Sequence, residues 1–209
     1  MYEDILRVIQ THSTLGGKVA GMILNPCLWA VACYRLAHWL WKSDVVLLPR
    51  LLSLAGRMTS GVDIAPSAEI GPGMLIVHGV GVTIEPGVRI GKAVTLYQGV
   101  GMGKRFGVRN SDGVPMLGDD VEVYAGAMIL GPITIGDRCR IGANAVVTRS
   151  FLDDTTIAGV PAHAVGRCRP GTGGTAGIPA VVDTARERKQ LAHAGAYPCS
   201  ATENQLELP

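Results

Sequence analysis

The stretch that decides the fold runs from residue 117 to residue 147 and reads LGDDVEVYAGAMILGPITIGDRCRIGANAVV. An aliphatic residue stands at every sixth position: Leu117, Val123, Ile129, Ile135, Ile141 and Val147. A period of six matches neither an α-helix, which repeats every 3.6 residues, nor a long strand, which repeats every two. It fits a short strand followed by a tight turn, and three such units close one triangular coil. The spacing therefore predicts a parallel β-helix.

The same period extends toward the amino end, with two interruptions. It appears at Ile64, Ile70 and Ile76, slips by two residues, and resumes at Ile84, Ile90 and Leu96. A longer interruption is expected from about Gly101 to Met116. So many positions in phase argue against a β-sandwich whose spacing is accidental. Gly follows the aliphatic residue at several repeats, and we expect Gly and Asn to supply turns with positive φ.

The segments outside the repeats predict an organisation in three parts. Apolar spacing predicts helices over residues 2–11, 26–42 and 45–58, with Pro26 in a first turn. We expect residues 1–60 to form a helical cap over the open end of the β-helix domain, residues 61–168. Residues 169–209 are rich in Gly, Ala, Thr and Pro without periodicity, and are expected to form a flexible tail that holds at most a short helix.

The amino-acid composition argues against several classes of protein. Gly and Pro make up 28 and 12 of 209 residues, yet 47% are hydrophobic, so the chain is neither disordered nor collagen-like. The formal net charge of +2 gives no reason to expect a nucleic-acid partner. Five cysteines without a CxxC pair predict reduced thiols, no zinc site and a cytoplasmic protein. The apolar stretch 19–41 contains Asn, Pro, Arg and His, so we expect no membrane span.

Several motifs, in the right order across about residues 26–168, resemble the serine O-acetyltransferase family. They are residues 34–41 (YRLAHWLW), 62–73 (VDIAPSAEIGPG), 77–82 (VHGVGV), 96–100 (LYQGV), 130–136 (LGPITIG) and 158–162 (AGVPA). The resemblance implies a left-handed β-helix that assembles as a homotrimer or a dimer of trimers, with active sites between neighbouring β-helices. It also implies acetyl-coenzyme A as the donor, acyl transfer without a metal, and no covalent enzyme intermediate.

His78 is the central catalytic candidate. Acyl transfer from a thioester needs a base for the attacking hydroxyl, and a neutral imidazole suits that task near pH 7. His78 lies at the register slip, where an irregular turn can direct a polar side chain outward; from position alone, a structural role in that turn is equally open. The resemblance implies that His78 is the base. It also implies that Asp63 is the carboxylate that orients the imidazole. The alternative is that Asp63 caps a turn.

The coenzyme site is implied only by the resemblance. Backbone groups of small residues in successive coils would bind the pantetheine arm, and the matching positions are Gly103, Ala125, Gly126 and Ala143. Plain repeat geometry is the other explanation for each of them. Residues 158–162 match the segment that closes the coenzyme groove.

The departures from the family fall on the acceptor side. Val77 stands where the family has an Asp immediately before the catalytic His. Gly113 and Val114 stand where it has an Arg-His pair that holds the serine carboxylate. A changed acceptor is therefore expected, such as an amino-acid-like or biosynthetic intermediate. The chain ends in Leu208-Pro209, without the terminal Ile that docks into the partner sulfhydrylase, so no cysteine-synthase complex is expected.

Three interpretations follow. The first is an acetyl-coenzyme A-dependent O-acetyltransferase acting on the hydroxyl of a small acceptor, with His78 as the base. The second is an N-acyltransferase or sugar O-acetyltransferase on the same fold. The third is a catalytically silent trimeric scaffold, against which the presence of both His78 and Asp63 argues.

Overall fold

A computed structural model describes residues 1–10, 14, 24–105 and 113–167. These residues all belong to one compact unit, Met1–Gly171. The expected flexible tail, residues 169–209, lies outside the described residues, as does residue 11 of the first expected helix.

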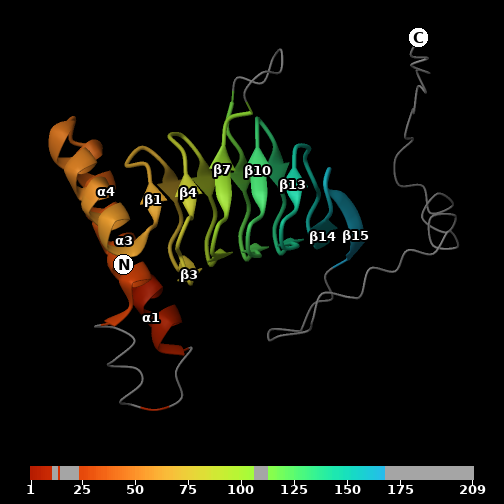
Figure 1. Ribbon diagram of the computed structural model, residues 1–209, viewed down its shortest axis with the longest axis horizontal. Helices are drawn as coiled ribbons and strands as arrows, with labels where there is room; N and C mark the ends of the chain where they lie inside the picture. Colours follow the sequence, from red (N-terminus) through yellow and green to blue (C-terminus); the bar gives the residue numbers. More distant parts are fainter. Residues whose placement is uncertain (11–13, 15–23, 106–112, 168–209) are drawn as a thin grey trace, which may run out of the picture. The chain divides into compact units, whose positions relative to one another are not determined.

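The chain winds into a parallel β-helix of four complete coils and part of a fifth, which confirms the fold class (Figure 1). Its triangular section has three sheets. Sheet A contains β1 (Asp63–Ile64), β4 (Thr83–Ile84), β7 (Gly101–Gly103), β10 (Met128–Leu130) and β13 (Val146–Val147). Sheet B contains β2 (Glu69–Ile70), β5 (Arg89–Ile90), β8 (Met116–Leu117) and β11 (Thr134–Ile135), which Phe151 extends by one bridge to Ile135. Sheet C contains β3 (Leu75–Val77), β6 (Thr95–Tyr97), β9 (Glu122–Val123), β12 (Arg140–Ile141), β14 (Thr155–Ala158) and the antiparallel β15 (His163–Arg167).

The six-residue repeat forms the core. All twelve aliphatic positions quoted above are buried, and Ile129, Ile141 and Val147 are fully inaccessible to solvent. Each side chain stacks on its equivalent in the next coil because the strands pair in register, as Ile64 pairs with Ile84. The expected interruption from Gly101 is wrong in one respect. Gly101–Gly103 is strand β7, and Met102, at 2% exposure, continues the buried row; the repeat breaks only after Gly103.

The glycines that follow the aliphatic residues have a different role from the one expected. Gly118 and Gly136 do not have positive φ. A Cβ at either position would collide with an aspartate of the next coil, Asp137 or Asp153. Those aspartates lie there because each accepts a backbone N–H: Asp119 N donates to Asp137 (2.8 Å) and Asp137 N to Asp153 (3.0 Å). Glycine is required in these turns, which join sheet B to sheet C, because the aspartate of the next coil comes so close to the backbone.

In these turns between sheets B and C the left-handed positions are mostly taken by other residues, Ala93, Asp120, Arg138 and Asp154. Glycines with left-handed backbone recur at the edge between sheets C and A. We call this edge, formed by residues 78–82, 98–100, 124–127 and 142–145, the third edge. Gly81, Gly99 and Gly126 have φ of 78°, 70° and 72°, and Asn144 has φ of 55°. Backbone bonds join successive turns, including Gly126 N to the Gln98 carbonyl (2.9 Å) and Asn144 N to the Ala125 carbonyl (2.8 Å). Here the expectation that Gly and Asn supply positive φ is confirmed.

In the described part of the chain, three helices cover the end of the β-helix next to β1 (Figure 1). They are α1 (Tyr2–Gln10), α3 (Pro26–Trp41) and α4 (Leu47–Ser60). The Asn25 side chain caps α3 by accepting from Cys27 N, and Pro26 occupies the first turn as expected. The third helix runs two residues later than expected at both ends, and Gly61 in left-handed conformation ends it. Within the described residues, none of the helices is long and apolar enough to cross a membrane.

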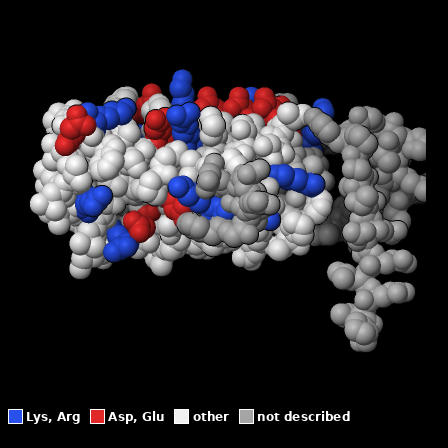
Figure 2. Space-filling view, turned by 90° about the horizontal axis from the view of Figure 1, so that it is seen from above, with Lys and Arg blue, Asp and Glu red and all other residues white. Residues whose placement is uncertain are grey.

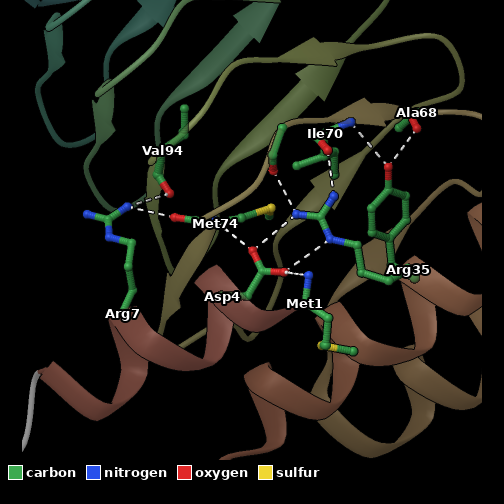
Figure 3. Close-up of polar contacts among 11 residues, drawn as sticks. Met1, Asp4, Arg7, Arg35, Ala68, Ile70, Met74 and Val94 are labelled. Carbon is green, nitrogen blue, oxygen red and sulfur yellow. Dashed lines mark hydrogen bonds and ion pairs between the residues drawn. The ribbon is translucent and has the colours of Figure 1, made fainter.

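A buried carboxylate ties α1 to the first coil (Figure 3). Asp4 is fully buried and accepts from the Arg35 guanidinium (3.1 and 3.2 Å), from Met74 N (2.9 Å) and from the terminal ammonium of Met1 (3.0 Å). Burial acts to raise the pKa of Asp4, but the hydrogen bonds and the charge of Arg35 outweigh it, so the pKa lies below its ordinary value. Arg7 donates to the Gly73 carbonyl (2.8 Å) from the same helix.

Candidate active site

His78 lies at the third edge, immediately after β3. Five residues, 78–82, connect β3 to β4, whereas three residues, 98–100, connect β6 to β7 in the next coil. The two-residue slip in the repeat is therefore a longer turn that begins with His78. Its backbone has a φ of 53°, unusual for a residue with a Cβ, and its side chain is exposed. The turn presents the imidazole to solvent.

Asp63 lies in β1, the strand of sheet A that begins soon after α4 ends. Its Oδ2 accepts from Arg57 Nη1 at 3.2 Å, and both side chains are substantially exposed. Within the part of the single chain that the structure describes, no hydrogen bond joins Asp63 to His78. The single chain thus pairs Asp63 with an arginine of the cap rather than with the imidazole.

Three of the four expected coenzyme-binding residues gather at one place. Ala125 and Gly126 lie at the third edge in the third coil, and Ala143 lies one coil further along the same edge. Ala143 is exposed, and Ala125 and Gly126 are half-buried, so the edge beyond His78 offers backbone with little side-chain cover. Gly103 is not part of this group. It ends β7, pairs with Leu130, and lies at the opposite border of sheet A.

The segment 158–162 lies beside this row. Val146 N donates to the Gly159 carbonyl (3.1 Å), and Ala162 N donates to the Val146 carbonyl (2.9 Å). Ala158 is also close to Gly142, where a Cβ would lie 3.2 Å from the Ala158 Cβ. The segment that the family motif matched therefore borders the third edge next to Ala143.

The side chains at the three positions that depart from the family are uncharged. Val77 is half-buried at the end of β3, directly before His78. Gly113 and Val114 are half-buried as well, and Gly113 lies against Pro132, where a Cβ would be 2.7 Å from the proline Cβ. None of these positions offers a charged side chain for a carboxylate.

An aromatic pair next to this turn was missed by sequence reasoning. Tyr97, the strand partner of Val77, stacks on Tyr124 with ring centroids 5.3 Å apart. The Tyr124 hydroxyl donates to Glu122 (2.8 Å). Burial, and then the hydrogen bond and charge of Glu122, raise the pKa of Tyr124 to about 12. Tyr97 and Tyr124 follow equivalent positions in successive coils, Leu96 and Val123. That equivalence, visible only when the loop between the two coils is left out of the count, is the one sequence signal that they meet. Arg57 was missed as well, because nothing in its local sequence links it to Asp63.

On the face shown in Figure 2, acidic side chains gather along one long rim, and most of the remaining described surface is uncharged. Within the described ranges, no three His, Cys, Asp or Glu side chains are grouped so as to hold a metal ion.

The fold and the repeat define a class of protein, the bacterial hexapeptide transferases. The bacterial transferase hexapeptide (six repeats) family matches residues 115–149. A serine acetyltransferase of Helicobacter pylori strain J99 is 42% identical over 163 residues, which cover 78% of this chain and 95% of that protein. A serine acetyltransferase of Synechococcus elongatus is 41% identical over 146 residues, but the match covers only 59% of its length and 70% of this chain. The chain belongs to the serine acetyltransferase family.

Solved structures agree with this assignment. Serine acetyltransferase from Brucella abortus in complex with coenzyme A superposes with a TM-score of 0.73 and 28% identity, covering 80% of this chain and 67% of that one. Soybean serine acetyltransferase complexed with serine gives a TM-score of 0.72 and 31% identity, covering 78% of this chain and 67% of that one.

Proposed function

We propose that this protein is an acetyl-coenzyme A-dependent O-acetyltransferase that acts on the hydroxyl of a small acceptor. Its family membership supports acyl transfer, and its relative from Brucella abortus binds coenzyme A. The observation that carries the proposal is the position of His78. An exposed imidazole, held by strained backbone in a turn with two extra residues, shares one edge with a row of uncovered small residues.

In the proposed reaction, acetyl-coenzyme A supplies the thioester. One ring nitrogen of His78 takes the proton of the acceptor hydroxyl while that oxygen attacks the thioester carbonyl. The same imidazolium then returns the proton to the departing thiolate, so His78 ends the cycle neutral. Asp63 orients the imidazole and stabilises its charged form, which requires the carboxylate to leave or share its contact with Arg57. The third edge at Ala125, Gly126 and Ala143 fits a narrow, uncharged arm because these small residues are half-buried or exposed and carry no bulky or charged side chain.

We further propose that the complete site forms between two chains of a trimer. Gly103 lies at the border of sheet A opposite to the third edge, so a single chain offers the expected contacts on two separate edges. Packing neighbouring β-helices side by side would bring one edge of each together. This arrangement accounts for the expected role of Gly103 without any change in the fold.

For the acceptor, we propose a molecule other than free serine. Half-buried Val77, Gly113 and Val114 replace the charged residues with which the family holds the serine carboxylate and amine. A charge-assisted hydrogen bond contributes about 1.5–3 kcal/mol, so losing several weakens recognition of a small zwitterion severely. An amino-acid-like or biosynthetic intermediate with a larger apolar part suits the remaining surface.

The test is thiol release from acetyl-coenzyme A with L-serine and a panel of hydroxyl and amine acceptors. We expect His78→Ala to lower kcat by about 10²–10⁴-fold on any productive acceptor. Lys92→Ala, an exposed change away from the third edge, serves as the control and should leave turnover unchanged. Turnover that does not depend on His78 would overturn the proposed base. Robust turnover on serine would show that the acceptor site is rebuilt by other residues, and preference for an amine would favour N-acylation.

A further inference from the structure

The turn that presents His78 is held through its backbone N–H groups. Gly81 N donates to the Gly61 carbonyl (2.9 Å), and Val82 N donates to the Gly79 carbonyl (3.0 Å). Gly79 N, one residue after His78, has a different kind of partner: the Sγ of Cys27, at 3.2 Å. A side chain of the helical cap therefore satisfies a backbone donor of the proposed catalytic turn.

This contact is buried and closely packed. Cys27 is 6% exposed, and Gly79 is buried as well. A Cβ at Gly79 would lie 3.0 Å from Cys27 Sγ and even closer to Val62 and Ile76, so the backbone of the turn rests directly on the sulfur. A buried N–H without a partner is costly.

The start of α3 holds the backbone from which the Cys27 sulfur projects. The Asn25 side chain accepts from Cys27 N (2.9 Å) and Leu28 N (3.3 Å), which anchors the first turn of the helix. With the backbone of Cys27 held by this cap, the sulfur can leave Gly79 only by a change of the side-chain rotamer within a buried contact. The first turn of α3 and the turn after β3 are thus coupled, although 52 residues separate Cys27 from Gly79.

We propose that Cys27 is a positioning residue for catalysis: its sulfur holds the Gly79 N–H and thereby fixes the direction in which His78 projects. The inference rests on the proposed role of His78 as the base. His78 has positive φ, a conformation that a residue with a Cβ keeps only when its surroundings enforce it. When the Gly79 N–H loses its partner, the turn relaxes and the imidazole moves relative to the acceptor. A misplacement of about 1 Å is enough to reduce turnover by about 10²-fold.

The test compares three variants at the two cysteines of α3. Cys27→Ala removes the acceptor, Cys27→Ser replaces it with a hydroxyl oxygen that also accepts, and Cys33→Ala removes the same atom from a half-buried position of the same helix. We expect Cys27→Ala to lower kcat by about 10–100-fold, with the KM for acetyl-coenzyme A within about twofold of wild type. Cys27→Ser should restore most of kcat, and Cys33→Ala should leave it unchanged.

A readout independent of activity is hydrogen exchange at the Gly79 amide, followed by NMR. The wild-type amide should be strongly protected, and Cys27→Ala should lose that protection while the strands of sheet A keep theirs. An unprotected Gly79 amide in the wild-type protein would overturn the proposal even if Cys27→Ala did not fold.

The remaining outcomes separate the two hypotheses. If His78→Ala keeps full turnover, the proposed base is wrong, and Cys27 then has no catalytic residue to position. If His78 is essential but Cys27→Ala and Cys33→Ala lower the melting temperature equally and leave kcat unchanged, Cys27 is structural only and the inference fails.

Discussion

At the scale of single residues, two kinds of glycine build this protein. Gly81 and Gly99 are required by positive φ, whereas Gly118 and Gly136 are required because an aspartate of the next coil occupies the place of a Cβ. The sequence makes the two kinds look alike. They differ in which residues can take their place. In the corresponding turn of a later coil, Asn144 takes the place of the first kind with a φ of 55°, whereas the second kind tolerates no side chain.

Gly118→Ala tests this distinction. The new Cβ would collide with Asp137 Oδ1 and lie 2.9 Å from backbone atoms that cannot move away cheaply. We expect the free energy of unfolding to fall by about 1–3 kcal/mol, measured by urea denaturation. Gly166→Ala is the matched control, because nothing lies within 4 Å of its new Cβ. Equal effects of the two substitutions would contradict the close-approach explanation.

At the scale of elements, the cap is attached to the β-helix by polar contacts as well as by packing. Tyr34 donates from α3 to the Ala68 carbonyl (2.7 Å), and Ser53 of α4 donates to the Ile64 carbonyl (2.6 Å). Burial raises the pKa of Tyr34 to about 12, since its hydroxyl is enclosed between the helix and the first coil. Asp4 of α1 accepts from Met74 N (2.9 Å), so each helix has its own polar contact with the first coil.

Asp4→Asn tests the attachment of α1. Removing one partner of a buried ion pair costs on the order of 3 kcal/mol, so the variant should be less stable at pH 7 by about that amount. Because the folded-state pKa of Asp4 is lowered, its contribution is present above the ordinary aspartate pKa of about 3.9 and is lost as the pH falls through the folded value. The difference between wild type and variant should therefore shrink below about pH 4.

Urea denaturation across a pH series measures both effects. Glu3→Gln, an exposed change one residue away, is the control and should alter stability by less than about 0.5 kcal/mol. A stability gap that persists unchanged in acid would mean that the Asp4 charge does not stabilise the docking of α1.

At the scale of the whole molecule, the β-helix separates the proposed contacts onto different edges. His78, Ala125, Gly126 and Ala143 share the third edge, and Gly103 lies at the other border of sheet A. If active sites form between neighbouring chains, each chain contributes a different edge to two different sites.

Mixing two inactive variants tests this arrangement. His78→Ala damages the third edge, and Gly103→Val damages the opposite border. We expect each to be inactive alone. After unfolding and refolding together, mixed trimers should regain activity, because some sites then receive His78 from one chain and Gly103 from its neighbour. Light scattering checks that the assembly contains three chains. No recovery from verified mixed trimers would place each site within one chain.

The sequence by itself determined the β-helix, because stacking one aliphatic side chain every six residues needs only local strand-and-turn geometry repeated along the chain. It also located His78, because an interrupted repeat is visible in the spacing. Only the tertiary structure decided which residues meet between the cap and the first coil: Asp63 with Arg57, and Cys27 with Gly79. These contacts depend on how the helices dock on the first coil, and the six-residue period does not predict them.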